Sequence, residues 1–128
     1  MKLMTWRGGA ALAELSFPAR RATSKIRRMA YEILVHELAA DEIASLRAYD
    51  QRRILEAIEQ QLSHEPTVPT RRRKCLIGLL PSFEHLLPVW ELRVGSFRVF
   101  YDVDDSSSQV HVRAVRHKNP FQQTHDIT

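Results

Sequence analysis

The stretch from Val89 to Lys118 constrains the fold of this chain most strongly, because it holds the residues of three consecutive strands. Its first part, Trp90 to Val94, alternates apolar and charged residues, as a strand with one buried and one solvated face does. Gly95-Ser96 can turn the chain back, and the run from Asp104 to Ser108 is composed of turn-forming residues. The pattern predicts a small twisted antiparallel sheet that carries arginines on one face and near its strand ends.

Alternation also assigns side chains to the two faces of this sheet. In the second strand, one face receives Phe97, Val99, Tyr101 and Val103, and the other receives Arg98, Phe100 and Asp102. In the third strand, Val110, Val112 and Ala114 are expected to alternate with His111, Arg113 and Val115.

The residues before this stretch predict a strand and two helices. Tyr31, Ile33 and Val35 alternate with Glu32, Leu34 and His36, which suits a first strand. A helix is expected over Leu38 to Leu46, followed by a second one that Asp50 caps and that carries apolar residues every four positions. The fold class is therefore α+β: an N-terminal strand and a helical hairpin packed on a twisted antiparallel sheet. A further strand is expected over Cys75 to Leu80, and the sheet face away from the helices is expected to stay open as a site.

Length and composition exclude several classes of protein. The chain has 128 residues, enough for one domain with a modest core, and no apolar run long enough to cross a membrane. Its single cysteine can form no internal disulfide, which fits a cytoplasmic location. The six histidines lack the spacing of metal ligands, and no glycine-rich phosphate loop is present, so we expect neither a metal nor a cofactor.

Charge is divided unevenly along the chain. Residues 1–28 hold seven Lys or Arg residues against one acid, and we interpret them as a basic, disordered extension that precedes a domain over residues 29–128. Residues 29–66 carry three bases and eight acids, whereas residues 67–128 carry nine bases and six acids. The helical half is thus acidic and the sheet half basic, which favours an anionic partner on the sheet side.

Four consecutive cations, Arg71, Arg72, Arg73 and Lys74, precede the expected second strand. Because like charges repel one another, a phosphate partner would explain them; an ordinary loop neutralised by the acidic helices would explain them equally well. We assign these four, together with Arg113 and Arg116, to a nucleic-acid-binding surface.

The residues from 29 to about 120 resemble the RelE/ParE superfamily of toxins from bacterial type II toxin–antitoxin systems. The matching features are the start Met29-Ala30-Tyr31-Glu32-Ile33, the helical hairpin, Lys74-x-Leu76-x-Gly78, the block from Trp90 to Asp104, and the closing Ala114-Val115-Arg116-His117-Lys118. The resemblance implies a compact toxin that a cognate antitoxin wraps and inactivates in a hetero-oligomer. It leaves the activity divided, because some members are ribosome-dependent endoribonucleases that cut messenger RNA, whereas ParE-like members inhibit DNA gyrase without chemistry of their own.

For the ribonuclease activity, the resemblance and the chemistry suggest specific roles. Arg98 and Arg93 would bind the scissile phosphate, since a guanidinium matches a phosphate well. His117 or Lys118 would assist proton transfer, and Glu91 could act as a base. Arg93 could instead form a salt bridge with Glu91 or with Asp102.

The C-terminal tail departs from the family pattern. No tyrosine follows Tyr101, so His125 would have to replace the aromatic hydroxyl or histidine of ribonuclease members. We therefore expect a translation-inhibiting ribonuclease with the ribosome and messenger RNA as partners and no membrane contact. A gyrase inhibitor and a non-toxic, antitoxin-binding family member are the alternatives.

Overall fold

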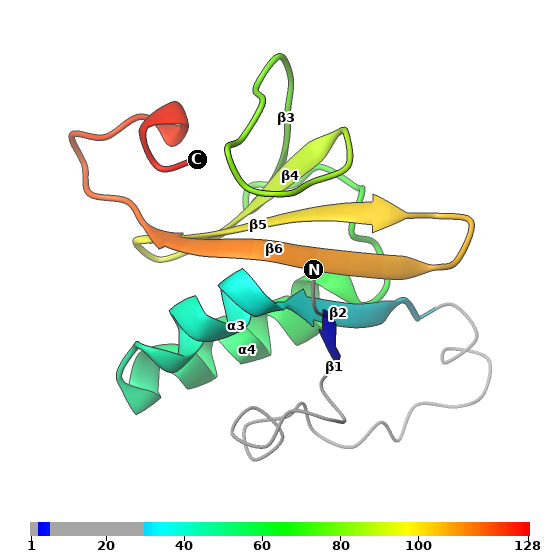
Figure 1. Ribbon diagram of the computed structural model, residues 1–128, viewed down its shortest axis with the longest axis horizontal. Helices are drawn as coiled ribbons and strands as arrows, with labels where there is room; N and C mark the ends of the chain where they lie inside the picture. The colour runs from blue at the N-terminus through cyan, green and yellow to red at the C-terminus, as the bar shows by residue number, and fades with distance from the viewer. Residues whose placement is uncertain (1–2, 6–29) are drawn as a thin grey trace.

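A computed structural model describes residues 3–5 and 30–128 (Figure 1). Its elements in chain order are β1 (Leu3–Thr5), β2 (Glu32–His36), α3 (Glu37–Ala44), α4 (Ala48–Leu62), β3 (Arg73–Leu76), β4 (Val89–Val94), β5 (Phe97–Asp104), β6 (Gln109–His117) and the 3-10 turn η1 (Thr124–Asp126). Most of the basic extension over residues 1–28 lies outside the described residues, although β1 belongs to it and pairs with β2. The division into an extension and a domain stays a prediction.

The six strands form one mixed sheet in the order β1-β2-β6-β5-β4-β3. Every neighbouring pair is antiparallel except β2 and β6, which run parallel. Strands β3, β4, β5 and β6 pair antiparallel in succession, so β6 runs opposite to β3. Because β2 also runs opposite to β3, β2 and β6 point the same way. The predicted α+β class is confirmed, and the parallel pair is the one departure from the expected antiparallel sheet.

The helices α3 and α4 cover one face of the sheet (Figure 1). The apolar stripe of α4, Ile54, Ile58 and Leu62, is fully buried there against the sheet. Burial of each such side chain contributes roughly 1.5–3 kcal/mol, so this contact is the main source of helical stability. Neither helix has the length and apolar character needed to cross a membrane.

The helix boundaries differ from the sequence expectation. Residue Arg47, with extended backbone, is the N-cap of α4, and Asp50 lies in the first turn. There Asp50 accepts a hydrogen bond of 2.9 Å from the Arg47 Nε and adds negative charge near the positive end of the helix dipole. The prediction of Asp50 as the N-cap was therefore wrong. A carboxylate stabilises a helix both at the N-cap and in the first turn, so the residue type alone does not distinguish the two positions.

The face of the sheet away from the helices is not open, contrary to the sequence expectation. Strand β3 ends at Leu76, and Gly78 then adopts a positive φ of 76° as the chain leaves the sheet. The loop over residues 77–88 and the C-terminal tail fold onto this face (Figure 1). A second apolar cluster forms beneath them, made of Leu76, Phe83, Val89, Phe100, Ala114 and Ile127.

A β-bulge in β6 also changes the predicted alternation. Phe100 pairs with Ala114 but Tyr101 pairs with Val112, so Arg113 is an extra residue in β6. Beyond it, Ala114 joins the second cluster and Val115 joins the helix-side core, the reverse of the expected order. The same shift places Arg116 opposite Arg98 and His117 opposite Phe97.

Candidate nucleic-acid interface

Arg98, the residue expected to bind the scissile phosphate, lies almost buried behind the β4–β5 turn with 9% of its surface exposed. Its Nη1 donates hydrogen bonds of 2.8 Å to the Gly95 carbonyl and 2.9 Å to its neighbour Phe97. Its Nε lies 3.6 Å from a Glu91 carboxylate oxygen. Burial lowers the pKa of Arg98, Glu91 raises it, and Arg93 lowers it again.

Glu91 is also covered, with 4% of its surface exposed. The Thr124 hydroxyl, from η1 of the C-terminal tail, donates a 3.2 Å hydrogen bond to its carboxylate. A general base must reach the proton that it abstracts. With Arg98 on one side and Thr124 on the other, the Glu91 carboxylate is held as part of the structure, and the tail would have to move before it could act on a substrate.

The exposed cations lie beside this buried pair. A hollow of about 390 Å³ is lined by Pro69, Thr70, Arg71, Arg72, Arg73, Lys74, Cys75, Glu91 and Arg93. Arg93 is exposed and directly opposite Arg98 in the β4–β5 pairing, and its backbone N–H donates to the Arg72 carbonyl at 2.8 Å. The expected basic run and the expected phosphate-binding hairpin therefore meet at one site.

Within the hollow, Arg73 differs from its neighbours because it is buried. Its guanidinium donates to the carbonyls of Val68 and Gln61, which ties the chain before β3 to the end of α4. Arg71, Arg72, Lys74 and Arg93 are exposed, and none of them forms an ion pair with another described residue. We call the hollow that these four exposed cations line the basic hollow. Unpaired like charges this close favour an anionic partner.

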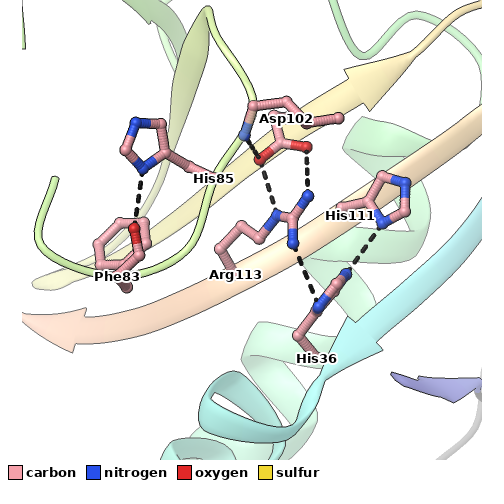
Figure 2. Close-up of polar contacts among 7 residues, drawn as sticks. His36, Phe83, His85, Asp102, His111 and Arg113 are labelled. Carbon is pink, nitrogen blue, oxygen red and sulfur yellow. Dashed lines mark hydrogen bonds and ion pairs between the residues drawn. The ribbon is translucent and has the colours of Figure 1, made fainter. Parts of the chain in front are cut away.

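Arg113, which was expected at the nucleic-acid surface, instead belongs to a buried polar network (Figure 2). Its Nε and Nη2 lie 2.8 and 3.1 Å from the two carboxylate oxygens of Asp102, and its Nη1 lies 3.2 Å from the His36 Nδ1. The backbone N–H of Leu86 donates to Asp102 at 3.0 Å, so the network also fixes the covering loop. The sequence pattern did not predict this pair; it offered Asp102 only as a partner of Arg93.

Two histidines complete the network, and no sequence pattern predicted that they meet. The His36 Nε2 lies 2.9 Å from the His111 Nδ1. Burial lowers the pKa of His36 to about 4, with Arg113 and His111 acting in the same direction. Burial and Arg113 lower the pKa of His111 as well, against the opposing charges of Asp102, Asp104 and Glu32.

Arg116 is half-buried and contacts α3, the C-terminal tail and the loop over residues 77–88. Its Nε lies 2.6 Å from a Glu42 carboxylate oxygen, its Nη1 donates to the Ile127 carbonyl at 3.0 Å, and its guanidinium lies 5.5 Å from the Phe83 ring centre. Glu42 in turn accepts the Val115 backbone N–H at 2.7 Å. Burial raises the pKa of Glu42, and its bonds to Val115 and Arg116 oppose that shift.

The predicted proton-transfer groups do not gather around Arg98. His117 is exposed and packs edge-on against Phe97, on the helix side of the sheet. The backbone of Lys118 bonds to Ser96 at 2.8 Å, and His125 is exposed with its Nε2 3.3 Å from Asp126. The structure thus brings Arg98, Arg93 and Glu91 together and puts His117 on the opposite face.

Among the residues that the structure describes, no cluster of three or more His, Cys, Asp or Glu side chains could hold a metal ion. The chemistry that these residues offer is binding of anions by arginine and lysine.

A family model matches most of the chain, and solved structures share its fold. Residues 33–119 match the family model described as the ParE toxin of the type II toxin–antitoxin system parDE. A comparison with curated proteins finds no match. Among solved structures, the chain is similar to the archaeal RelE–RelB complex from Pyrococcus horikoshii OT3, with 22% identity, a TM-score of 0.54, and coverage of 72% of this chain and 99% of that one.

It is also similar to the toxin–antitoxin complex RelBE2 from Mycobacterium tuberculosis, with 19% identity, a TM-score of 0.50, and coverage of 70% of this chain and 99% of that one. These likenesses show that the fold is the one seen in RelE toxins. Because the family model spans more than half of the sequence, the chain belongs to the RelE/ParE family and is a toxin of a type II toxin–antitoxin system.

Proposed function

We propose that this toxin binds messenger RNA on the ribosome and promotes its cleavage. The observation that carries the proposal is the basic hollow, Arg71, Arg72, Lys74 and Arg93, which lies directly beside the Arg98–Glu91 pair. Exposed guanidinium and ammonium groups bind phosphate through charge-assisted hydrogen bonds, and the guanidinium matches its geometry.

Cleavage of RNA by its own 2′-hydroxyl builds negative charge on the attacked phosphorus group. Cations fixed around that group stabilise the charge, and one well-placed donor contributes about 10²–10³-fold in rate. Arg93 is exposed and would contact the phosphate first, with Arg98 behind it, 9% exposed. The ribosome-bound messenger RNA would supply the reactive geometry, and the toxin would supply positive charge.

We also propose a cognate antitoxin as the protein partner. Of the two similar structures described above, one is a RelE–RelB complex and the other is a toxin–antitoxin complex. An antitoxin that covered the basic hollow would block access of RNA to Arg93. Binding of RNA and binding of antitoxin should then exclude one another.

A second candidate function is inhibition of DNA gyrase without catalysis. One observation favours it: among the described residues predicted to transfer protons, Glu91 is covered and His117 lies on the other face of the sheet from Arg98. A binding toxin requires no acid and no base, so this arrangement would not impair it.

Primer extension on messenger RNA after brief induction of the full chain tests the proposal. We expect new 5′ ends inside translated regions, reduced about 100-fold by Arg93→Gln, since a hydrogen bond to a charged group contributes up to about 3 kcal/mol. Arg52→Gln is the matched control, because Arg52 is exposed on α4 and lines no part of the hollow.

Intact messenger RNA combined with growth arrest and double-strand breaks in DNA would contradict the ribonuclease and support the gyrase inhibitor. Intact messenger RNA without arrest would indicate the non-toxic, antitoxin-binding family member.

A further inference from the structure

A second hollow adjoins the basic hollow on the side of α4. It measures about 340 Å³ and is lined by Arg53, Glu56, Ala57, Gln60, Arg72, Arg93, Val94 and Gly95. Arg72 and Arg93 line both hollows. The two depressions are therefore neighbours that share a cationic wall, and the second one extends the exposed positive charge from the sheet onto α4.

Gly95 allows Arg53 to reach this wall. A Cβ atom at position 95 would lie 2.5 Å from the Arg53 Nη2, and the Gly95 φ is +59°. The positive φ favours glycine here, whereas a larger residue would also push the flexible end of the Arg53 side chain aside. The guanidinium of Arg53 consequently lies over the β4–β5 turn, near the strand ends that carry Arg93 and Arg98.

Two neighbours hold the Arg53 guanidinium without using all of its donors. Its centre lies 5.6 Å from the centre of the Tyr49 ring, and its Nη1 lies 3.6 Å from an Asp50 carboxylate oxygen, too far for a hydrogen bond. The Arg53 side chain remains 39% exposed. A guanidinium has five N–H donors, so this residue retains donors for a ligand.

The charges around the second hollow favour an anion. Three cations, Arg53, Arg72 and Arg93, face one carboxylate, Glu56. The Tyr49 ring beside Arg53 is 56% exposed, and the Arg47 guanidinium also lies over it, 5.7 Å from its centre. Unpaired bases stack on aromatic rings and on guanidinium planes, whereas a carboxylate gains little from such a ring. The combination is therefore better suited to a single-stranded nucleic acid than to an acidic protein segment.

We propose that the two hollows form one track for single-stranded RNA, in which Arg53 binds a second phosphate beyond the one at Arg93 and Tyr49 stacks a base. This inference rests on the proposed function in that it takes RNA as the ligand. It adds two residues of α4 that the sequence pattern did not select. The track would set the path of the RNA strand across the β4–β5 turn.

The test measures binding of a short single-stranded RNA oligonucleotide to the purified full chain by fluorescence anisotropy over a range of salt concentrations. Each phosphate contact on a single strand adds about 0.7 to the slope of log affinity against log salt. We expect Arg53→Gln to reduce the slope by about 0.7, and Arg53→Lys to retain it. The matched control Arg52→Gln, one residue away, should leave the slope unchanged.

Tyr49→Leu should weaken binding about 10-fold without changing the slope, because stacking is not an ionic contact. Equal slopes for Arg53→Gln and Arg52→Gln would overturn the track. Loss of antitoxin affinity in Arg53→Gln, with RNA binding intact, would overturn it in favour of an acidic protein partner. The RNA track and the ribonuclease activity can be contradicted separately. If the Arg53 variants show the expected salt slopes but messenger RNA is not cleaved, the track is supported and the ribonuclease is contradicted.

Discussion

At the scale of single residues, the Arg98–Glu91 pair decides how activity data must be interpreted. Both side chains are nearly buried, so removal of one leaves the other as an uncompensated charge. Loss of toxicity in Arg98→Ala would then reflect unfolding as well as lost phosphate binding. Arg93, which is exposed in the same strand pairing, is the better probe of phosphate contact.

We predict that Arg98→Ala lowers the free energy of unfolding by about 3 kcal/mol, the low end for a broken buried pair. Urea denaturation would measure it. The double variant Arg98→Met, Glu91→Leu should recover most of the loss, because an apolar pair leaves no buried charge. If the double variant were as unstable as Arg98→Ala, the buried charge would not be the cause.

The His36 site predicts a pH dependence of stability. The pKa of His36 is about 4 in the folded protein and about 6.5 in the unfolded chain, so the unfolded chain binds more protons between these values. The stabilising effect is complete above pH 6.5 and is lost as the pH falls toward 4. Between pH 7 and pH 5 this single group should lower the free energy of unfolding by about 2 kcal/mol.

His36→Gln removes this titration and should flatten the decline measured by urea denaturation at the two pH values. His125→Gln is the control, since His125 is exposed on the tail. An equally steep decline in His36→Gln would show that other groups cause the acid sensitivity.

The sequence predicted residue positions better than residue environments. The strand pattern put Arg98 and Asp102 on the same face, and both lie there. It treated the run from Arg71 to Lys74 as one basic segment, whereas Arg73 points inward to two carbonyl groups. Such contacts depend on which backbone groups the fold leaves unpaired, and local sequence does not encode that.

At the scale of elements, the C-terminal tail and the loop over residues 77–88 act as a second layer. The Ser82 backbone N–H and hydroxyl both donate to the Thr128 carbonyl, at 2.9 and 2.7 Å. Ile127 is 7% exposed within the second apolar cluster. The two segments are thus joined to one another as well as to the sheet.

We predict that Ile127→Ala lowers the free energy of unfolding by about 2 kcal/mol, since it opens a cavity above the sheet. Thermal or urea unfolding would measure it. Phe121→Ala is the matched control on the same tail, because Phe121 is 94% exposed and should change stability by less than about 0.5 kcal/mol. Equal effects of the two substitutions would argue against the tail as a packed layer.

The existence and type of the main elements followed from periodicity, but their details did not. The period of β5 predicted its faces correctly along its whole length. The bulge at Arg113 reversed the faces of β6 beyond it, and only the partner strand reveals an inserted residue. In the same way, the covering of the second face depends on contacts between Ser82 and Thr128, which are far apart in the sequence.

At the scale of the whole molecule, charge and architecture combine into one surface. The acidic helical half and the basic sheet half were visible in the sequence, and the fold brings the basic run, the β4–β5 turn and Arg53 of α4 to adjoining hollows. A resemblance in residues 29 to about 120 predicted the family that the comparisons show. The contribution of α4 could not be foreseen, since it follows from the close approach at Gly95.

Cleavage of messenger RNA in a reconstituted translation system would distinguish a ribosome-dependent ribonuclease from a gyrase inhibitor. Purified full chain is added to programmed ribosomes, or to the same RNA without ribosomes, and new 5′ ends are mapped. We predict cleavage with ribosomes only, reduced about 100-fold by Arg93→Gln and unaffected by Arg52→Gln. Intact messenger RNA under these conditions, together with inhibition of DNA supercoiling by purified gyrase, would contradict the ribonuclease.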